Sequence, residues 1–355
     1  MRGWVLRIGQ ASFVLRPRAL LVGGCAVLVL LLAVLAHLMF AGRPLAFGEV
    51  LTGLSGGPGA PSRLILQVQD FRLPRTVAGA VAGACLAVSG ALTQNVARNP
   101  LATPEILGVT AGASLGAVAV LVLAGGGAGG LSGAAAAVGL PLAAGLGALL
   151  FGGGVFLLAV KRGSDVLDSN RMVLVGLGAT AVATSMVTWL LTLGDVTNAG
   201  QALTWMSGSL NGKDWDTVSP VTVVALPLLL ISAFVARWLL LGSFDDNTAR
   251  SLGLPLRWTR PLLLLLAVLL AAVGTVLAGP VAFVALVCPL AARQVTGTVV
   301  APLGVTALLG ACFVVVADLV AGFVLPQALP VGVLTTVLGA PVLIALVLRS
   351  QRRTS

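Results

Sequence analysis

Long apolar segments recur along the chain, and short stretches between them carry most of the charges. We count ten candidate membrane spans, roughly at 20–41, 75–97, 104–124, 134–160, 171–193, 218–241, 259–279, 281–296, 301–322 and 331–349. An α-helix needs about 20 apolar residues to cross a bilayer. The strands of a β-barrel would alternate polar and apolar residues, and these segments do not. The pattern predicts an all-α, polytopic membrane protein with about ten transmembrane helices.

The same pattern divides the chain into three parts. Residues 1–19 form a basic N-terminal segment, 20–349 a transmembrane domain, and 350–355 a short tail. The first apolar run is too long for a signal-peptide core and lacks a clear small-x-small cleavage site. We therefore interpret it as a first span that enters from the cytoplasm. The glycine-rich stretch 125–133 is expected to be a loop.

The charge of the chain supports this topology. Charged residues make up 9% of the sequence, against about 25% in a soluble domain. The net charge of +10 could suggest nucleic acid, but ten spans with an inner N-terminus place 16 of the 21 basic residues on the cytoplasmic side. We expect both termini in the cytoplasm, a lipid bilayer as environment and no nucleic-acid partner. The five basic residues predicted outside are Arg43, Arg63, Arg72, Arg75 and Lys213.

Small residues at four-residue spacing predict close helix contacts. Gly79 and Gly83 form one such step in the second predicted span, and Gly108, Gly112 and Gly116 form two in the third. In lipid, such stripes let two backbones approach closely. We interpret both stripes as packing surfaces.

Few polar or reactive side chains lie within the spans. The four cysteines fit neither a disulfide framework nor a zinc site, and we interpret them as small packing residues. The single histidine, His37, is near the outer end of the first span and is expected to be a membrane-interface residue. Asp318 is the one acid well inside a span. It is either a functional group or a hydrogen-bonded structural carboxylate.

Catalytic motifs do not stand out. The one Gly-Lys pair, at Lys213, is followed by aspartate and lacks the P-loop pattern, and no metalloprotease or nucleophile-elbow motif is evident. We therefore expect that the chain is not an enzyme, binds no metal, and needs an external motor if it transports.

A polar stretch between the sixth and seventh predicted spans has the signals of a short helix. It reads GSFDDNTARSLGLPLRWTR, residues 242–260. Ser243 is a good N-cap, and Asp245 and Asp246 fall in the first turn, where the helix dipole favours negative charge. Gly253 and a proline two residues later are stop signals. We expect a helix of about nine residues on the cytoplasmic face, either an ordinary connection or a docking element for an ATPase.

Several stretches resemble one family. RLPRTVAGAVAGACLAVSGALTQNVARNPLATPEILGVTAGASLGA (72–117) resembles the permeases of iron-siderophore, haem and cobalamin importers, often called FecCD, which belong to the type II ABC importers. The segment SFDDNTARSLGL (243–254) resembles their ATPase-coupling helices. GPVAFVALVCPLAAR (279–293) and LPVGVLTTVLGAPVLIALVLR (329–349) resemble their last third.

The resemblance implies a particular assembly in the bacterial cytoplasmic membrane. Two permease subunits of ten spans each would form a pore above two cytoplasmic ABC ATPases. The ATPases would hold ATP and Mg²⁺, while this chain would bind no cofactor. An extracytoplasmic solute-binding protein would deliver the ligand. Ferric siderophores are the expected cargo, with the enterobactin-like group favoured, and haem and cobalamin are the alternatives.

The resemblance also implies site residues. In such permeases, arginines of the R-L-P-R-T motif meet glutamates on the binding protein; here these are Arg72 and Arg75. Because they stand three residues apart, they are expected to share a helix face. Contact with lipid phosphate groups is the alternative role. Coupling to the ATPase is expected of the 243–253 helix through Ser243, Phe244, Asp245, Asp246, Ala249, Arg250, Leu252 and Gly253.

The chain departs from the family pattern at two positions. A further arginine commonly follows the ninth-span Ala-Asp pair, and Gly322 stands there instead. This departure removes one positive charge from the expected docking site and slightly favours a heterodimer with a different permease subunit. The family often has Pro-His in the eighth span, where this chain has Leu290 after the proline, so no role of that histidine transfers.

The sequence allows two interpretations of the polar residues near the expected transport path. Ser89, Thr93 and Gln94 occupy the inner part of the second span, where they either line the path or form hydrogen bonds between helices. Two rival functions also remain: a proton-coupled secondary transporter and a membrane scaffold that transports nothing.

Overall fold

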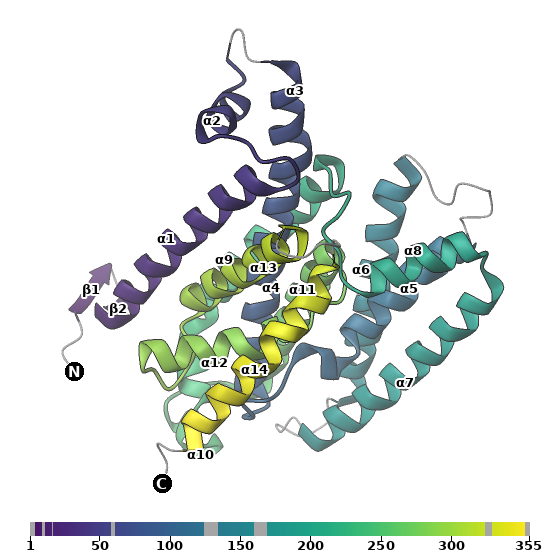
Figure 1. The fold of residues 1–355 in the computed structure, drawn as a ribbon. Coiled ribbons are helices and arrows are strands. Elements are labelled where there is room, and N and C mark those ends of the chain that lie inside the picture. The colour runs from purple at the N-terminus through teal and green to yellow at the C-terminus, as the bar shows by residue number, and fades with distance from the viewer. Residues whose placement is uncertain are drawn as a thin grey trace.

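A bundle of helices makes up most of the protein in the computed structural model (Figure 1). The structure describes residues 4–8, 11–15, 17–57, 61–123, 134–159, 169–323 and 329–351. The predicted glycine-rich loop at 125–133 lies outside these residues. The N-terminal segment contains an antiparallel hairpin, β1 (Trp4–Ile8) and β2 (Ala11–Leu15), which the all-helical prediction did not include.

Ten apolar helices lie at the ten predicted spans. Seven described helices are long and apolar enough to cross a membrane, and three more are apolar but shorter. In chain order the ten are α1 (Pro17–Phe40), α4 (Leu73–Val96), α5 (Val109–Leu123), α6 (Ala134–Ala159), α7 (Ser169–Leu193), α9 (Trp215–Gly242), α11 (Leu256–Ala278), α12 (Val284–Thr296), α13 (Leu303–Phe323) and α14 (Val331–Gln351).

The third span begins later than the predicted 104–124. A 3₁₀ turn, η2 (Pro104–Leu107), precedes α5, and Gly108 separates the two with a left-handed φ of +71°. Glycine is favoured there because a side chain would strain this backbone. Gly108 is therefore a turn residue and not the first member of a packing stripe.

Short elements between the spans were not predicted. They are α2 (Phe47–Ser55), α3 (Ser62–Ile65), the π-helix η1 (Leu66–Arg72) and α8 (Val196–Met206). The helix α3, η1 and α4 follow one another without a break, so residues 62–96 form one rod of 35 residues. A π-helical insertion within such a rod often marks a functional site.

The α4 part of the rod lies at the centre of the bundle, where it packs against α13, α11, α12 and α9. Its contacts are close because its glycines face the backbone of neighbouring helices. A Cβ on Gly83 would lie 2.2 Å from the carbonyl oxygen of Gly310, and a Cβ on Gly90 would lie 1.8 Å from the carbonyl oxygen of Ala285. In α5, Gly112 and Gly116 meet α6 in the same way. The predicted packing stripes are confirmed at Gly83, Gly112 and Gly116.

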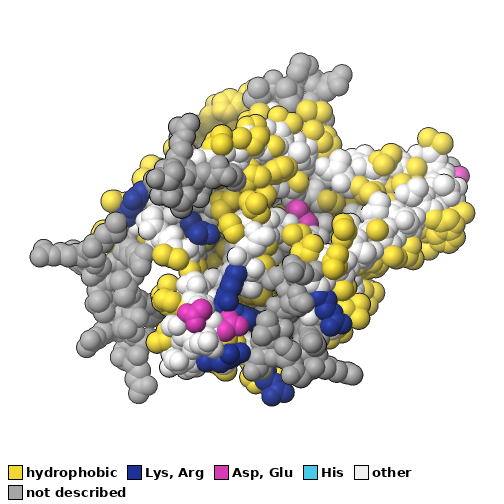
Figure 2. All heavy atoms as spheres, turned by 90° about the horizontal axis from the view of Figure 1, so that it is seen from below, with side chains coloured by type: hydrophobic (Ala, Val, Ile, Leu, Met, Phe, Trp, Pro, Cys, Tyr) yellow, Lys and Arg dark blue, Asp and Glu magenta, His cyan; other side chains and the backbone are white. Residues whose placement is uncertain are grey.

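The two ends of the bundle differ. One, which we call the α2 end, carries α2 and α3; the other, the α10 end, carries the short helix α10 (Asp246–Ser251), which Figure 1 places at the bottom. Figure 2 views the molecule from that side, and Lys and Arg side chains gather there. Arg250 of α10, Arg257 and Arg260 of α11, and Arg98, which follows α4, lie at this end.

Candidate functional site

Arg72 is buried at the α2 end, and its side chain closes the end of α1. Its guanidinium donates hydrogen bonds to the carbonyl oxygens of Leu38, Met39 and Arg43, at 2.5–3.1 Å, and the residue is 3% exposed. The last carbonyls of a helix have no partner within the helix, and a cation is favourable beside them. Arg72 therefore fixes α1 and the following loop to the rod.

Arg75 lies one turn further along the rod but points to another partner. Its Nε and Nη2 donate to the two carboxylate oxygens of Asp318 on α13, at 2.7 and 2.8 Å. The Arg75 side chain is 24% exposed, whereas that of Asp318 is 3% exposed. The expectation that Arg72 and Arg75 face outward together is wrong, because only Arg75 reaches the surface in this structure.

His37 of α1 completes this cluster, and its side chain faces the protein interior, whereas that of a membrane-interface residue would face the surroundings. It is buried, its Nε2 lies 2.8 Å from Asp318 Oδ2, and its Nδ1 lies 2.8 Å from Thr76 Oγ1. The partner of this histidine is 281 residues away in the chain, so no local pattern indicated it. Asp318 is a hydrogen-bonded carboxylate, as one of the two interpretations of the sequence had it.

Gly322, one turn beyond Asp318, borders the same cluster. A Cβ on this glycine would lie 3.9 Å from Nη2 of Arg75. The position at which the family resemblance implied a further arginine is thus beside Arg75, and here it adds no charge.

At the opposite end, α10 begins two residues later than the sequence predicted. The N-cap is Asp245, whose carboxylate accepts from the backbone N–H of Thr248 at 3.0 Å and from its hydroxyl at 2.6 Å. These hydrogen bonds lower the pKa of Asp245. Ser243 instead donates to the Leu240 carbonyl within α9, so its prediction as N-cap is wrong. The helix has six residues, and Gly253 follows it with a φ of +82°, as a stop signal should.

Asp246 ties α10 to two neighbouring elements. Its Oδ1 lies 2.6 Å from Nη2 of Arg98, which follows α4, and 2.6 Å from Nη2 of Arg260 on α11. The hydrogen bond from Arg260, followed by the charges of Arg260 and Arg98, lowers the pKa of Asp246 despite partial burial. Arg98 also donates to the Phe244 carbonyl at 2.6 Å. The sequence did not indicate either arginine as a partner.

The α10 segment has one buried face and one open face. Ala249 is fully buried and packs with Leu254 and Leu256, beside Trp238 and Leu241. Phe244 is 46% exposed and Leu252 is 54% exposed, and Arg250 is exposed as well. An open face with apolar side chains on a helix held by ion pairs is suited to contact with another protein.

The predicted pathway residues form contacts between or within helices. Ser89 donates to the Ala267 carbonyl of α11 at 2.6 Å, and Thr93 donates to the Ser89 carbonyl of its own helix. Both are fully buried. Gln94 donates to the Leu286 carbonyl of α12 at 3.3 Å and borders a cavity of about 270 Å³ near Arg98 and Ser243. In this conformation Ser89 and Thr93 therefore form hydrogen bonds to helix carbonyls, as the second of the two interpretations expected.

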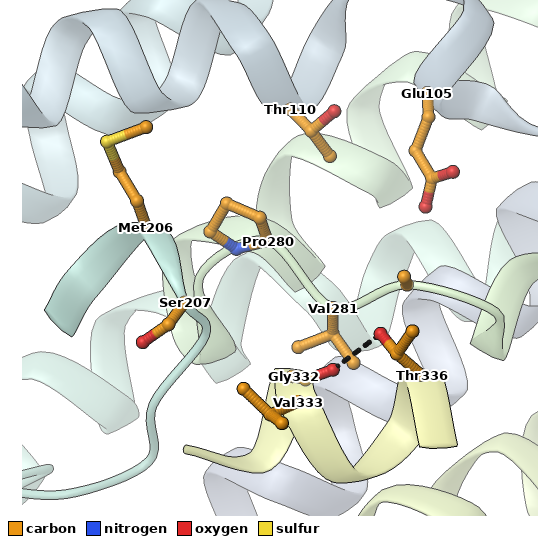
Figure 3. Close-up of a pocket in the computed structure, with 10 residues that line it drawn as sticks. Glu105, Thr110, Met206, Ser207, Pro280, Val281, Gly332, Val333 and Thr336 are labelled. Carbon is orange, nitrogen blue, oxygen red and sulfur yellow. Dashed lines mark hydrogen bonds between the residues drawn. The ribbon is translucent and has the colours of Figure 1, made fainter. Parts of the chain in front are cut away.

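A larger cavity, of about 410 Å³, opens where α5, α8, α14 and the segment before α12 meet (Figure 3). Its polar groups include Glu105, Thr110, Ser207 and Thr336, and Figure 3 shows Glu105 and Thr110 across the space from the first turn of α14. Burial raises the pKa of Glu105. The residues come from four separate segments, so sequence reasoning missed this cavity.

Comparisons with known proteins agree with this architecture. The FecCD transport family model matches residues 28–349. The ferric enterobactin transport system permease protein FepG of Escherichia coli (strain K12) is 36% identical over 86% of this chain and 88% of its own length. The Fe(3+) dicitrate transport system permease protein FecD of the same strain is 35% identical over 94% and 97%.

A further relative and a solved structure extend the similarity. The vitamin B12 import system permease protein BtuC of Salmonella paratyphi A is 35% identical over 92% of this chain and 94% of its own length. A solved chain described as a candidate metal-chelate type ABC transporter, in an inward-facing conformation, shares the fold with a TM-score of 0.79. It is 24% identical and covers 92% of this chain and 99% of its own. The chain belongs to the FecCD transport family and is a non-catalytic, multi-pass permease subunit of an ABC importer.

Proposed function

We propose that this permease imports a ferric siderophore, which an extracytoplasmic solute-binding protein delivers and two cytoplasmic ATPases drive across the membrane. A second permease subunit completes the pore. Among the relatives, FepG is named for ferric enterobactin and FecD for Fe(3+) dicitrate, whereas BtuC is named for vitamin B12. Two of these three relatives are named for iron compounds. The similarity to the enterobactin permease favours a catecholate siderophore as the cargo over the alternatives, haem and cobalamin.

The observation that carries the proposal is the α10 segment. It is anchored by Arg98 and Arg260, and its exposed side includes Phe244, Arg250 and Leu252. Rigid anchorage matters because a partner that moves α10 then also moves α4 and α11. Basic residues gather at this end, which favours a cytoplasmic location for it and for both termini. The ATPases therefore dock on α10 and on residues 243–253 around it.

The α2 end then faces the binding protein. Of the two motif arginines, Arg75 is the partly exposed one, and its position near the start of α4 places it at the mouth of the bundle. We assign docking to Arg75, which would meet an acidic residue of the partner. Arg72 supports it indirectly, because its buried guanidinium holds the neighbouring loop. Gly322 leaves the site with one arginine fewer than is common, which favours a non-identical second permease subunit that brings more positive charge.

Uptake of radioiron tests the substrate. Cells that lack their own siderophore permease and express this chain with its ATPase and binding protein should accumulate iron from ferric enterobactin. An excess of unlabelled ferric enterobactin should abolish this accumulation, whereas cobalamin and haem should not. Competition by cobalamin or haem instead would reject the siderophore assignment.

A further inference from the structure

The cluster at the α2 end contains more hydrogen-bonding capacity than an ion pair needs. Arg75 of α4, Asp318 of α13 and His37 of α1 meet with Thr76, so three helices contribute. The Thr76 hydroxyl lies 2.8 Å from His37 Nδ1 and 2.8 Å from the carbonyl oxygen of Arg72. A hydroxyl has a single hydrogen and can donate to only one of them at a time.

This arrangement accommodates two protonation states of His37. In both, Nε2–H donates to Asp318. When His37 is neutral, Nδ1 accepts from the Thr76 hydroxyl. When His37 is protonated, Nδ1–H donates to Thr76, whose own hydrogen turns to the Arg72 carbonyl. Every polar atom of the pair is satisfied either way, and only a hydroxyl rotates.

We propose that Asp318 is a positioning residue that holds Arg75 for the extracytoplasmic partner, and that protonation of His37 sets the net charge of this docking site. With His37 neutral, Arg75 and Asp318 cancel. With His37 protonated, the cluster has a net charge of +1 and Arg75 attracts a partner carboxylate more strongly. The inference rests on the proposed docking role of Arg75.

Other features of this end make the charge of His37 a larger part of the total charge of the docking site. Gly322 adds no cation beside Arg75, and the guanidinium of Arg72 is directed to three carbonyl groups. Within the cluster of Arg75, Asp318, His37 and Thr76, His37 is therefore the group that can add a second positive charge, while the exposed Arg43 and Arg63 lie at the same end outside this cluster.

The charged groups around His37 are few. The elements packed against α1 are α13, α12, α4, α2 and η1. Among their described residues, Asp318, Arg75 and Arg72 form or border the cluster, while Glu49 of α2, Asp70 of η1 and Arg293 of α12 have no hydrogen bond to the imidazole. Asp318 is thus the anion that contacts the imidazole, and Arg75 binds the same carboxylate.

The first test uses the fact that His37 is the only histidine of the chain. The complete permease, purified with a tag that contains no histidine and labelled with ¹⁵N-histidine, should give one imidazole spectrum to follow from about pH 5 to 8. The inference requires that this spectrum change with pH in the wild type. The Asp318→Asn variant should give a different dependence on pH, because the carboxylate that contacts Nε2 is gone. A spectrum that does not change with pH, or that is the same in the variant, would overturn the role of the cluster.

The second test measures docking of the solute-binding protein from the same operon on the permease–ATPase complex in nanodiscs. Wild-type affinity should be about three-fold higher near pH 6 than near pH 8, since one partly screened charge changes. His37→Gln keeps an N–H for Asp318 but cannot titrate, and it should remove this pH dependence. If the variant keeps it, the titrating group is elsewhere and the inference is wrong.

The Asp318→Asn variant distinguishes a role of Asp318 in positioning Arg75 from the effect of its charge alone on docking. The substitution makes the site more positive, so charge alone predicts tighter docking. If Asp318 positions Arg75, docking should instead weaken by about two- to ten-fold, because a freed side chain must be ordered again on binding. Tighter docking would contradict the positioning role. Absence of any docking in the wild type would contradict the proposed function itself, whereas docking without pH dependence would contradict only this inference.

Discussion

Arg260, in the first turns of α11, holds Asp246 of α10 through two hydrogen bonds of 2.6 and 3.3 Å. Arg98 reaches the same carboxylate from the end of α4. The shortest helix of this end is thereby joined to two of the most buried helices of the bundle. A displacement of α10 is expected to be transmitted to both.

Asp246→Asn should weaken coupling between ATP hydrolysis and transport. The substitution removes the charge that both arginines share, and uptake per ATP should fall about three- to ten-fold, consistent with a loss of about 1 kcal/mol. Asp245→Asn is the matched control. It removes the same charge one residue away, but asparagine is an equally good N-cap and the ion pairs of Asp246 stay intact, so uptake per ATP should fall clearly less than in Asp246→Asn. Equal effects of the two variants would contradict the anchoring role of Asp246.

The same carboxylate predicts a pH dependence of stability. Because Arg260 lowers the pKa of Asp246, the folded protein keeps it ionised where the unfolded chain begins to protonate. Its contribution is complete above the ordinary aspartate pKa of about 4 and is lost as pH falls through the lowered value. The melting temperature of the wild type in detergent should exceed that of Asp246→Asn at neutral pH, and the difference should shrink below about pH 4. A difference that grows with acidification would refute this sign.

Arg72 and Arg75 should separate into a structural and a docking residue. Arg72→Gln leaves carbonyls at the end of α1 without their donor, at about 1–3 kcal/mol for each group that stays unsatisfied, and should lower the melting temperature. Arg75→Gln removes a partly exposed cation and should mainly weaken binding of the solute-binding protein. Thermal unfolding and docking, measured on both variants, check this division. It fails if Arg72→Gln leaves stability intact.

Close packing of α4 against α13 gives a prediction with its own control. A Cβ on Gly310 would lie 2.2 Å from the Gly83 carbonyl oxygen, so Gly310→Ala forces the helices apart at about 1–3 kcal/mol. Gly304 is on the same helix with open space around it, and Gly304→Ala should be neutral or stabilising by up to about 1 kcal/mol. Thermal unfolding of both variants should show opposite or clearly unequal shifts.

The sequence was sufficient to predict the spans, because a bilayer requires long apolar helices and these are visible locally. The glycine contacts followed from four-residue spacing, except at Gly108, where a turn decides. The side-chain networks could not be predicted in this way. Asp318 meets Arg75 and His37 across 243 and 281 residues, and the start of α10 depends on which of two neighbouring capping residues, Ser243 or Asp245, bonds to Thr248.

The short helices were not predicted from the sequence for a related reason. The helices α2 and α8 have nine and 11 residues, too short for a span and without a long apolar run. The cavity at Glu105 arises only when four distant segments pack together. Composition and periodicity do not record such packing.

ATP-driven uptake in proteoliposomes tests the central claim most directly. The permease, its partner subunit if it has one, the ATPase and the binding protein are reconstituted with ferric siderophore outside and ATP inside. The account predicts uptake that stops when the ATPase carries an inactivating Walker-motif substitution and that an imposed pH gradient does not replace. Uptake that persists with the inactive ATPase, or that a pH gradient alone drives, would contradict it and favour a proton-coupled secondary transporter.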